Sequence, residues 1–132
     1  MKAFTIQLEN QPGGLARVAE AIAERGINIT AIAGATAGDK GAVGLMTNDE
    51  PGTRSALDAA GIQVTEIEVI GVTLAHQPGT LAGAARRLAN AGVNIELLLP
   101  TDLEGAEAQV AIGVDNIDAA REALGELATA TA

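Results

Sequence analysis

The feature that most constrains this chain is an internal repeat at an offset of 66 residues. Residues 10–15 read Asn-Gln-Pro-Gly-Gly-Leu and return at 76–81 as His-Gln-Pro-Gly-Thr-Leu, while 26–29 read Gly-Ile-Asn-Ile and return at 92–95 as Gly-Val-Asn-Ile. Single positions match at the same offset, among them Asp49 with Asp115. Two segments that recur without a gap indicate a duplicated folding unit.

Hydrophobic periodicity predicts the same order of elements in both copies. Alternating apolar residues such as Phe4, Ile6 and Leu8 are typical of a strand, and apolar residues three or four apart are typical of a helix. In the first copy the expected strands are 3–8, 27–33, 42–47 and 62–66, and the expected helices are 15–25 and 53–60. In the second copy the expected strands are 69–75, 93–99 and 107–114, the helices are 81–91 and 117–127, and 128–132 leaves a weak last strand. The hairpin loops are expected at 34–41 and 100–105.

A β-α-β-β-α-β order predicts an α+β fold of two ferredoxin-like modules in tandem, each an antiparallel sheet with both helices on one face. We expect domains at 1–67 and 68–132, the last strand of the second being weak or missing. Each module alone would leave its sheet edges open. Joining the two sheets side by side into one eight-stranded sheet would cover an edge of each, and we expect that arrangement.

Composition excludes several classes of function. A net charge of −9, with eight Lys and Arg against seventeen Asp and Glu and no Trp or Tyr, argues against a nucleic-acid partner. No apolar run is long enough for a membrane span, and the chain lacks cysteine, so we expect a cytoplasmic protein without disulfides. The single histidine, His76, has no second ligand at metal spacing. We therefore expect no metal, cofactor or catalytic residues, and no enzyme.

The repeated Pro-Gly turn is the best candidate for a binding site. It precedes a helix, whose first N–H groups and positive dipole end suit a carboxylate. Glycine lets a ligand approach the backbone, and the carboxamides of Asn10 and Asn28 can both donate and accept hydrogen bonds. The same residues could instead serve folding alone, because proline suits a first helical turn and asparagine can bond backbone groups at a strand start. Thr80 could cap its helix or contact a ligand.

The pattern Asn-x-Pro-Gly-x-Leu followed by Gly-x-Asn-Ile, present in two copies, resembles the ACT domain. The resemblance implies a stand-alone tandem of small regulatory modules that bind an amino acid between paired modules, with the Asn residues holding its amino and carboxylate groups. His76 stands where the first copy has Asn10, so the two sites should differ. The expected ligand-binding residues are Asn10, Gln11, Pro12, Gly13, Gly14, Leu15, Asn28, Ile29, His76, Gln77, Gly79, Thr80, Leu81, Asn94 and Ile95.

The expected function is that of a regulatory sensor. An amino acid, small or branched and aliphatic by the family analogy, would bind at the turn and change self-association or the contact with a partner enzyme or regulator. A homodimer could form through the uncovered sheet face or the C-terminal edge. The alternative is an interaction module that keeps the ACT fold without a ligand and acts through partner proteins.

Overall fold

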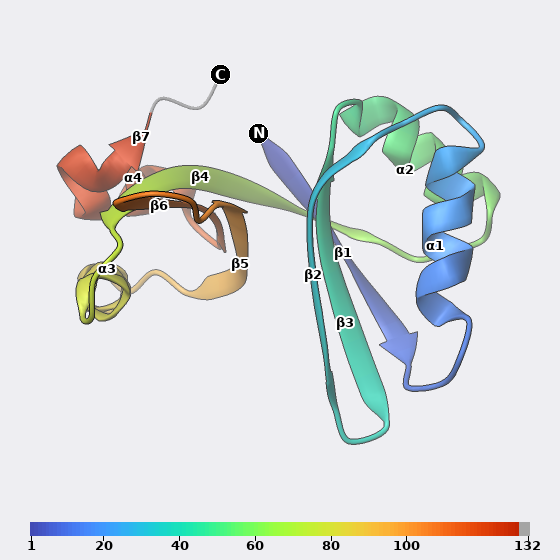
Figure 1. The fold of residues 1–132 in the computed structure, drawn as a ribbon, viewed down its shortest axis with the longest axis horizontal. Coiled ribbons are helices and arrows are strands. Elements are labelled where there is room, and N and C mark those ends of the chain that lie inside the picture. Colours follow the sequence, from blue (N-terminus) through green and yellow to red (C-terminus); the bar gives the residue numbers. More distant parts are fainter. Residues whose placement is uncertain (130–132) are drawn as a thin grey trace. The chain divides into compact units, whose positions relative to one another are not determined.

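A computed structural model describes residues 1–129 of the chain (Figure 1). The chain folds into two compact units. One unit is Lys2–Glu66, and the other begins at Ile67 and also takes in Met1. No helix within residues 1–129 is long and apolar enough to cross a membrane.

The first unit follows the predicted order of elements. Its elements are β1 (Lys2–Glu9), α1 (Gly14–Ala23), β2 (Ile29–Ala37), β3 (Lys40–Thr47) and α2 (Glu50–Ala59), followed by the start of β4 (Thr65–Ala75). The strands lie in the order β2-β3-β1 and pair antiparallel. Both helices lie on one face of this sheet (Figure 1), and the core between them contains Phe4, Ile6, Val18, Ile22, Leu45 and Leu57.

The second unit repeats this arrangement. After β4 come α3 (Thr80–Asn90), β5 (Ile95–Asp102), β6 (Glu107–Val114), α4 (Ile117–Leu124), the short 3-10 helix η1 (Gly125–Leu127) and β7 (Ala128–Thr129). β6 pairs with β5 and β4, and β7 pairs with β4, all antiparallel. Residues of both helices and of the strands form one buried cluster, which includes Ile70, Leu88, Ile112 and Leu124. The predicted α+β fold, with two β-α-β-β-α-β modules, is confirmed.

Three details of the strand prediction are wrong. Residues 65–66 of the predicted strand 62–66 and all of the predicted strand 69–75 lie in one continuous strand, β4, so residues 1–129 contain seven strands instead of eight. Residues 62–64 precede that strand. The predicted loop 34–41 is mostly strand, because its residues pair across the hairpin and only Gly38 and Asp39 make the turn. Gly38 has φ +69°, the left-handed conformation that a tight turn needs. The second hairpin is also longer than predicted, since β5 continues to Asp102.

The last strand was predicted to be weak, and β7 has two residues, Ala128 and Thr129. The rest of that predicted segment, 130–132, lies outside the described residues. The strand therefore begins at its expected place, where Gly71 pairs with Thr129.

The repeat gains one residue within the second hairpin. Phe4 pairs with Leu45 as Ile70 pairs with Ile112, so the offset is 66 residues on the first strand but 67 after the hairpin. The register shifts between Pro100 and Asp102, which absorbs the extra residue. The sequence match of Asp49 with Asp115 is therefore not a structural equivalence.

The structural equivalents at these positions are shown by their hydrogen bonds. Asp49 caps α2 by accepting from Gly52 N at 2.9 Å, and Asn116 caps α4 by accepting from Ala119 N at 3.1 Å. A side-chain cap satisfies an N–H group that the helix leaves without a partner. Asp115 corresponds instead to Asn48, the residue before the first cap.

Candidate functional site

The first Pro-Gly turn places a glycine in the left-handed region at the start of α1. Gln11 N donates to Glu9 O at 2.8 Å, which closes the turn after β1. Gly13 has φ +95° and is the N-cap of α1, and no side chain caps this helix end. The first-turn N–H groups of the helix therefore have no side-chain acceptor of the usual capping kind, which leaves them able to meet an acceptor from outside.

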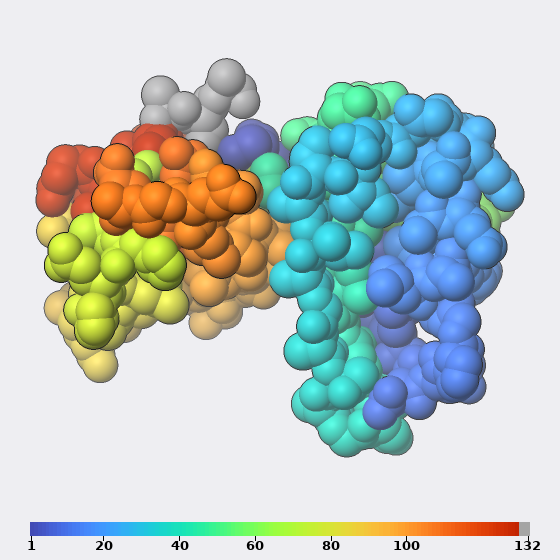
Figure 2. Space-filling view, in the orientation of Figure 1, coloured from blue at the N-terminus to red at the C-terminus, as the bar shows by residue number. Residues whose placement is uncertain are grey.

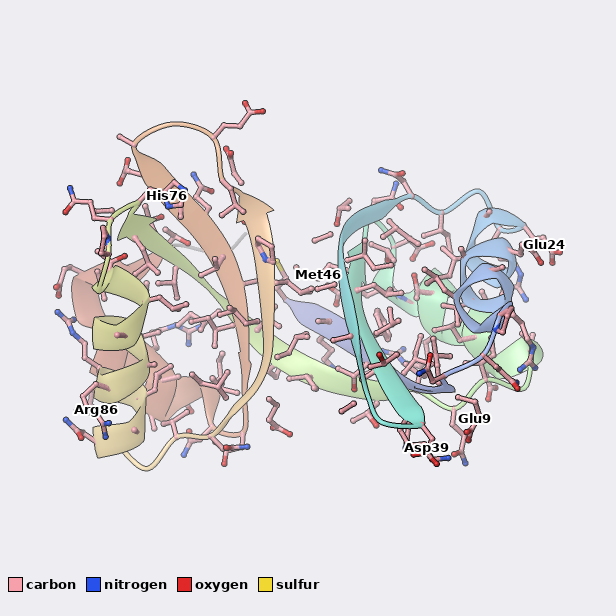
Figure 3. The ribbon with its side chains drawn as sticks, turned by 60° about the horizontal axis from the view of Figure 1, so that its bottom comes forward. Glu9, Glu24, Asp39, Met46, His76 and Arg86 are labelled. Atoms are coloured by element: carbon pink, nitrogen blue, oxygen red, sulfur yellow. The ribbon has the colours of Figure 1, made fainter. Side chains whose placement is uncertain are left out.

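Asn10 joins this turn to the tip of the β2–β3 hairpin. Its Nδ2 donates to Gly38 O at 3.1 Å, and its backbone N donates to Asp39 O at 3.1 Å. Beside it Lys40 forms an ion pair with Glu9, and Figure 3 shows Glu9 and Asp39 at the same end of the unit. The hydrogen bond from Nδ2 orients the carboxamide, so that Oδ1 is the group best placed to accept from a ligand ammonium.

A groove of about 550 Å³ lies between this turn and β2. Asn10, Gln11, Gly14 and Leu15 line it from the turn and the first turn of α1, and its other walls come from β1, β2 and β3. Leu15 and Ile32, both lining residues, are 49% and 45% exposed. Polar groups at one end and aliphatic side chains along the wall suit a small amphipathic ligand. In Figure 2 an opening is visible between the blue residues and the teal hairpin, above the hairpin tip.

A second hollow, of about 620 Å³, lies on the β1 side of the same turn. Gln11, Pro12, Gly13 and Gly14 line it together with Gln7, Glu9, Arg17, Lys40 and Gln63. The Arg17 guanidinium already has a hydrogen-bond partner in this hollow, because its Nη2 donates to Ala60 O, at the end of α2, at 2.6 Å. The structure thus places Gln11, Pro12, Gly13 and Gly14 at one turn, with Asn10 and Leu15 on its β2 side.

Asn28 and Ile29 do not line either hollow. Asn28 is exposed, and its backbone is held at the start of β2, where its N donates to Asn48 Oδ1 at 3.0 Å and its O accepts from Asn48 N at 3.1 Å. Asn94 is also exposed and is held by Asp115 in the same way, at 3.0 Å and 3.3 Å. Sequence reasoning missed Asn48 and Asp115, although a polar residue between a strand and a helix cap is a recognisable signal.

The second turn has the same backbone but different side chains. His76 N donates to Ala106 O at 2.8 Å, and Gly79 has φ +90°. Thr80 bonds the turn itself, since its Oγ1 donates to Ala75 O at 2.7 Å and to Gln77 O at 3.1 Å. These bonds close the turn, and no side chain caps α3, so the expectation that Thr80 caps its helix is wrong. A contact between Thr80 and a ligand stays a prediction. Figure 3 shows His76 at this end of the second unit.

The clearest charge interaction of the first unit lies away from the Pro-Gly turn. The Arg54 side chain donates two hydrogen bonds to the Glu66 carboxylate, and these bonds hold the Glu66 pKa below its ordinary value. Arg54 and Glu66 line a larger hollow of about 1060 Å³ along β1. No cluster of three metal-ligating side chains occurs in residues 1–129. Exposed ion pairs of this kind are common on protein surfaces, so this pair alone does not indicate a functional site.

Comparison with known proteins identifies the fold. Residues 3–61 match the family model of the ACT domain. The crystal structure of protein BT0572 from Bacteroides thetaiotaomicron is 31% identical with a TM-score of 0.77, and the alignment covers 95% of this chain and 86% of that one. The regulatory subunits of aspartate kinase from Thermus thermophilus and Thermus flavus are 22% and 20% identical, with TM-scores of 0.64 and 0.63, and share the fold. Both alignments cover 96% of this chain and 90% of the other. No curated protein matches the sequence.

Proposed function

This chain belongs to the ACT domain family, and on that premise we propose that it is a regulatory amino-acid sensor whose ligand binds beside the first Pro-Gly turn. The observation that carries the proposal is the groove of about 550 Å³ in which Asn10, Gln11 and the start of α1 meet an aliphatic wall. The helix start supplies N–H groups for a carboxylate, the Asn10 carboxamide supplies an acceptor for an ammonium group, and the wall receives a side chain.

The regulatory step requires that the ligand bind one state of the protein better than another. Asn10 joins the turn to the hairpin tip, so a ligand held at this turn would also stabilise the position of β2 and β3. We propose that this changes self-association, including formation of a homodimer, or contact with a partner enzyme or regulator. Asn28 and Ile29 do not line the groove, so we propose that any contact they make with a ligand is made to one held by a second, paired module. The stand-alone tandem organisation and the cytoplasmic location stay predictions.

An interaction module without a ligand is the second candidate, and one observation favours it. Large apolar side chains are exposed at equivalent positions of both units: Leu15 and Leu81 are 49% and 46% exposed, and Ile32 and Leu98 are 45% and 37% exposed. Exposed apolar side chains that recur in this way are compatible with a protein-binding surface. In this candidate, as in the first, the protein has no catalytic role.

A thermal-unfolding screen against the twenty amino acids tests the proposal and separates the two candidates. A ligand present at 100 times its Kd should stabilise the protein by about 2.7 kcal/mol. The chain has no Trp or Tyr, so unfolding is followed by circular dichroism. Asn10→Ala should abolish the shift, whereas the matched change Asn90→Ala, at the end of α3, should leave it intact. A flat panel on folded protein would refute the sensor and favour the interaction module.

A further inference from the structure

Three glycines line the groove of the first unit, and the second unit has a side chain at each equivalent position. Gly34 pairs with Val43 as Pro100 pairs with Val110, and Leu8 pairs with Gly41 as Leu74 pairs with Ala108. Gly14 begins α1 as Thr80 begins α3. The equivalents of Gly14, Gly34 and Gly41 are therefore Thr80, Pro100 and Ala108.

The strand glycines lie where a side chain would occupy space at the floor of the groove. A Cβ atom on Gly34 would lie 3.2 Å from Val43 Cγ2, and one on Gly41 would lie 3.2 Å from Thr36 Cγ2. Both distances are shorter than ordinary van der Waals contact, so a methyl group at either glycine would press on Val43 or Thr36, which themselves line the groove, and would alter its floor. Neither glycine has a left-handed φ, so the backbone conformation itself does not require glycine here.

The counterparts in the second unit carry atoms at these places. Ala108 is buried, at 7% exposure, and Pro100 has a ring at the position of Gly34. Thr80 has its hydroxyl bonded to Ala75 O, at the turn where Gly14 leaves the first groove open. Because His76 also replaces Asn10, the second unit has side chains where the first groove has glycines, and it has no carboxamide at the position of Asn10.

We infer that each chain binds a single amino acid, in the groove of the first unit, and that this ligand has a branched aliphatic side chain. The inference rests on the proposed function and adds the site count and the ligand class. The wall consists of aliphatic and small residues, chiefly Leu8, Leu15, Ile32 and Val43. Glu9 is the charged residue of the lining, and it pairs with Lys40. Because Glu9 is already paired with Lys40, the wall offers a charged ligand side chain no unpaired opposite charge, whereas a branched apolar side chain gains by leaving water.

Isothermal titration calorimetry on the full chain tests the inference with named probes: L-valine, L-isoleucine and L-leucine, compared with L-alanine, L-aspartate, L-lysine and L-phenylalanine. We expect the branched probes to bind at one site per chain. Gly34→Ala and Gly41→Ala should each weaken that binding about 10-fold or more, because a methyl group takes the space of a ligand methyl. Gly83→Ala is the matched control, since nothing lies within 4 Å of a Cβ at that position, and it should bind like the parent.

The outcomes separate this inference from the proposed function. Two sites per chain, parental affinity in folded Gly34→Ala and Gly41→Ala, or binding of the charged or aromatic probes alone would overturn the inference and leave an amino-acid sensor standing. Absence of binding by all seven probes, or binding of L-alanine alone, would overturn the inference, and a flat thermal-unfolding panel against all twenty amino acids would overturn both. If one glycine variant does not fold, the other decides, and the number of sites in the parent protein is an independent readout.

Discussion

We predict that position 13 needs glycine because of its left-handed backbone conformation, and not because a side chain would lack space there. Gly13 has φ +95° and ψ −11°, and nothing lies within 4 Å of a Cβ built at this position. Gly13→Ala therefore adds no clash and places an L-residue in the left-handed region, at a cost of about 1–2 kcal/mol. For a unit of this size the unfolding midpoint should fall by roughly 5–10 °C. The measurement is thermal unfolding followed by circular dichroism.

Gly83→Ala makes the same chemical change inside α3, where the space is also open and the backbone is helical. Alanine is the better helix former, so this variant should gain about 0.5–1 kcal/mol. The two substitutions thus have opposite signs although each adds one methyl group. A Gly13→Ala protein as stable as its parent would refute the left-handed turn, and a destabilised Gly83→Ala protein would show that open space around the glycine is not the deciding factor.

Three further predictions concern stability. Asp49→Ala removes the cap of α2 and should cost about 1 kcal/mol in urea unfolding; an unchanged midpoint would show that the cap contributes nothing. Arg54 lowers the Glu66 pKa in the folded state, so the pair stabilises the fold above the unfolded pKa of Glu66, and this stabilisation is lost as pH falls through the folded pKa. Glu66→Gln should remove that part of the pH dependence of the unfolding free energy. An identical pH profile for the variant and the parent would contradict this prediction. Leu124→Ala opens a cavity at a fully buried position and should lower the free energy of unfolding by about 2–5 kcal/mol. Leu103→Ser, at a position that is 51% exposed, should change it by less than about 0.5 kcal/mol. Equal effects of the two substitutions would contradict the described core.

The order of elements could be predicted because apolar periodicity and the two Pro-Gly turns recur together. Continuity of β4 was missed, although residues 65–68 contain no glycine or proline to end a strand. The first hairpin was predicted too short because Gly34 and Gly41 were interpreted as loop residues. Their pairing with Val43 and Thr36 shows instead that both glycines lie within paired strands.

Less of the candidate site could be predicted than of the fold. Proximity in the chain brings the turn residues together: Asn10, Gln11, Gly14 and Leu15 line the groove, and Pro12 and Gly13 line the second hollow. Their role in binding a ligand stays a prediction. The walls from β2 and β3 could not be predicted, because they depend on strand register, and the extra residue in the second hairpin displaces the sequence match of the copies by one position after it. The same shift concealed the equivalence of Asn48 with Asp115. Asn28 shares a sequence motif with the site, but its position at the far end of β2 keeps it out of the groove.

The most direct test of the central claim is a titration of ¹⁵N-labelled protein with L-valine, L-isoleucine or L-leucine, followed by NMR. We expect saturable shifts of the backbone amides of Asn10, Gln11, Gly13, Gly14 and Leu15 and of residues 32–36 in β2. The corresponding amides at 76–81 should remain unchanged. Saturable shifts centred elsewhere, or spectra unchanged by every amino acid, would contradict the assignment of a ligand to the first Pro-Gly turn.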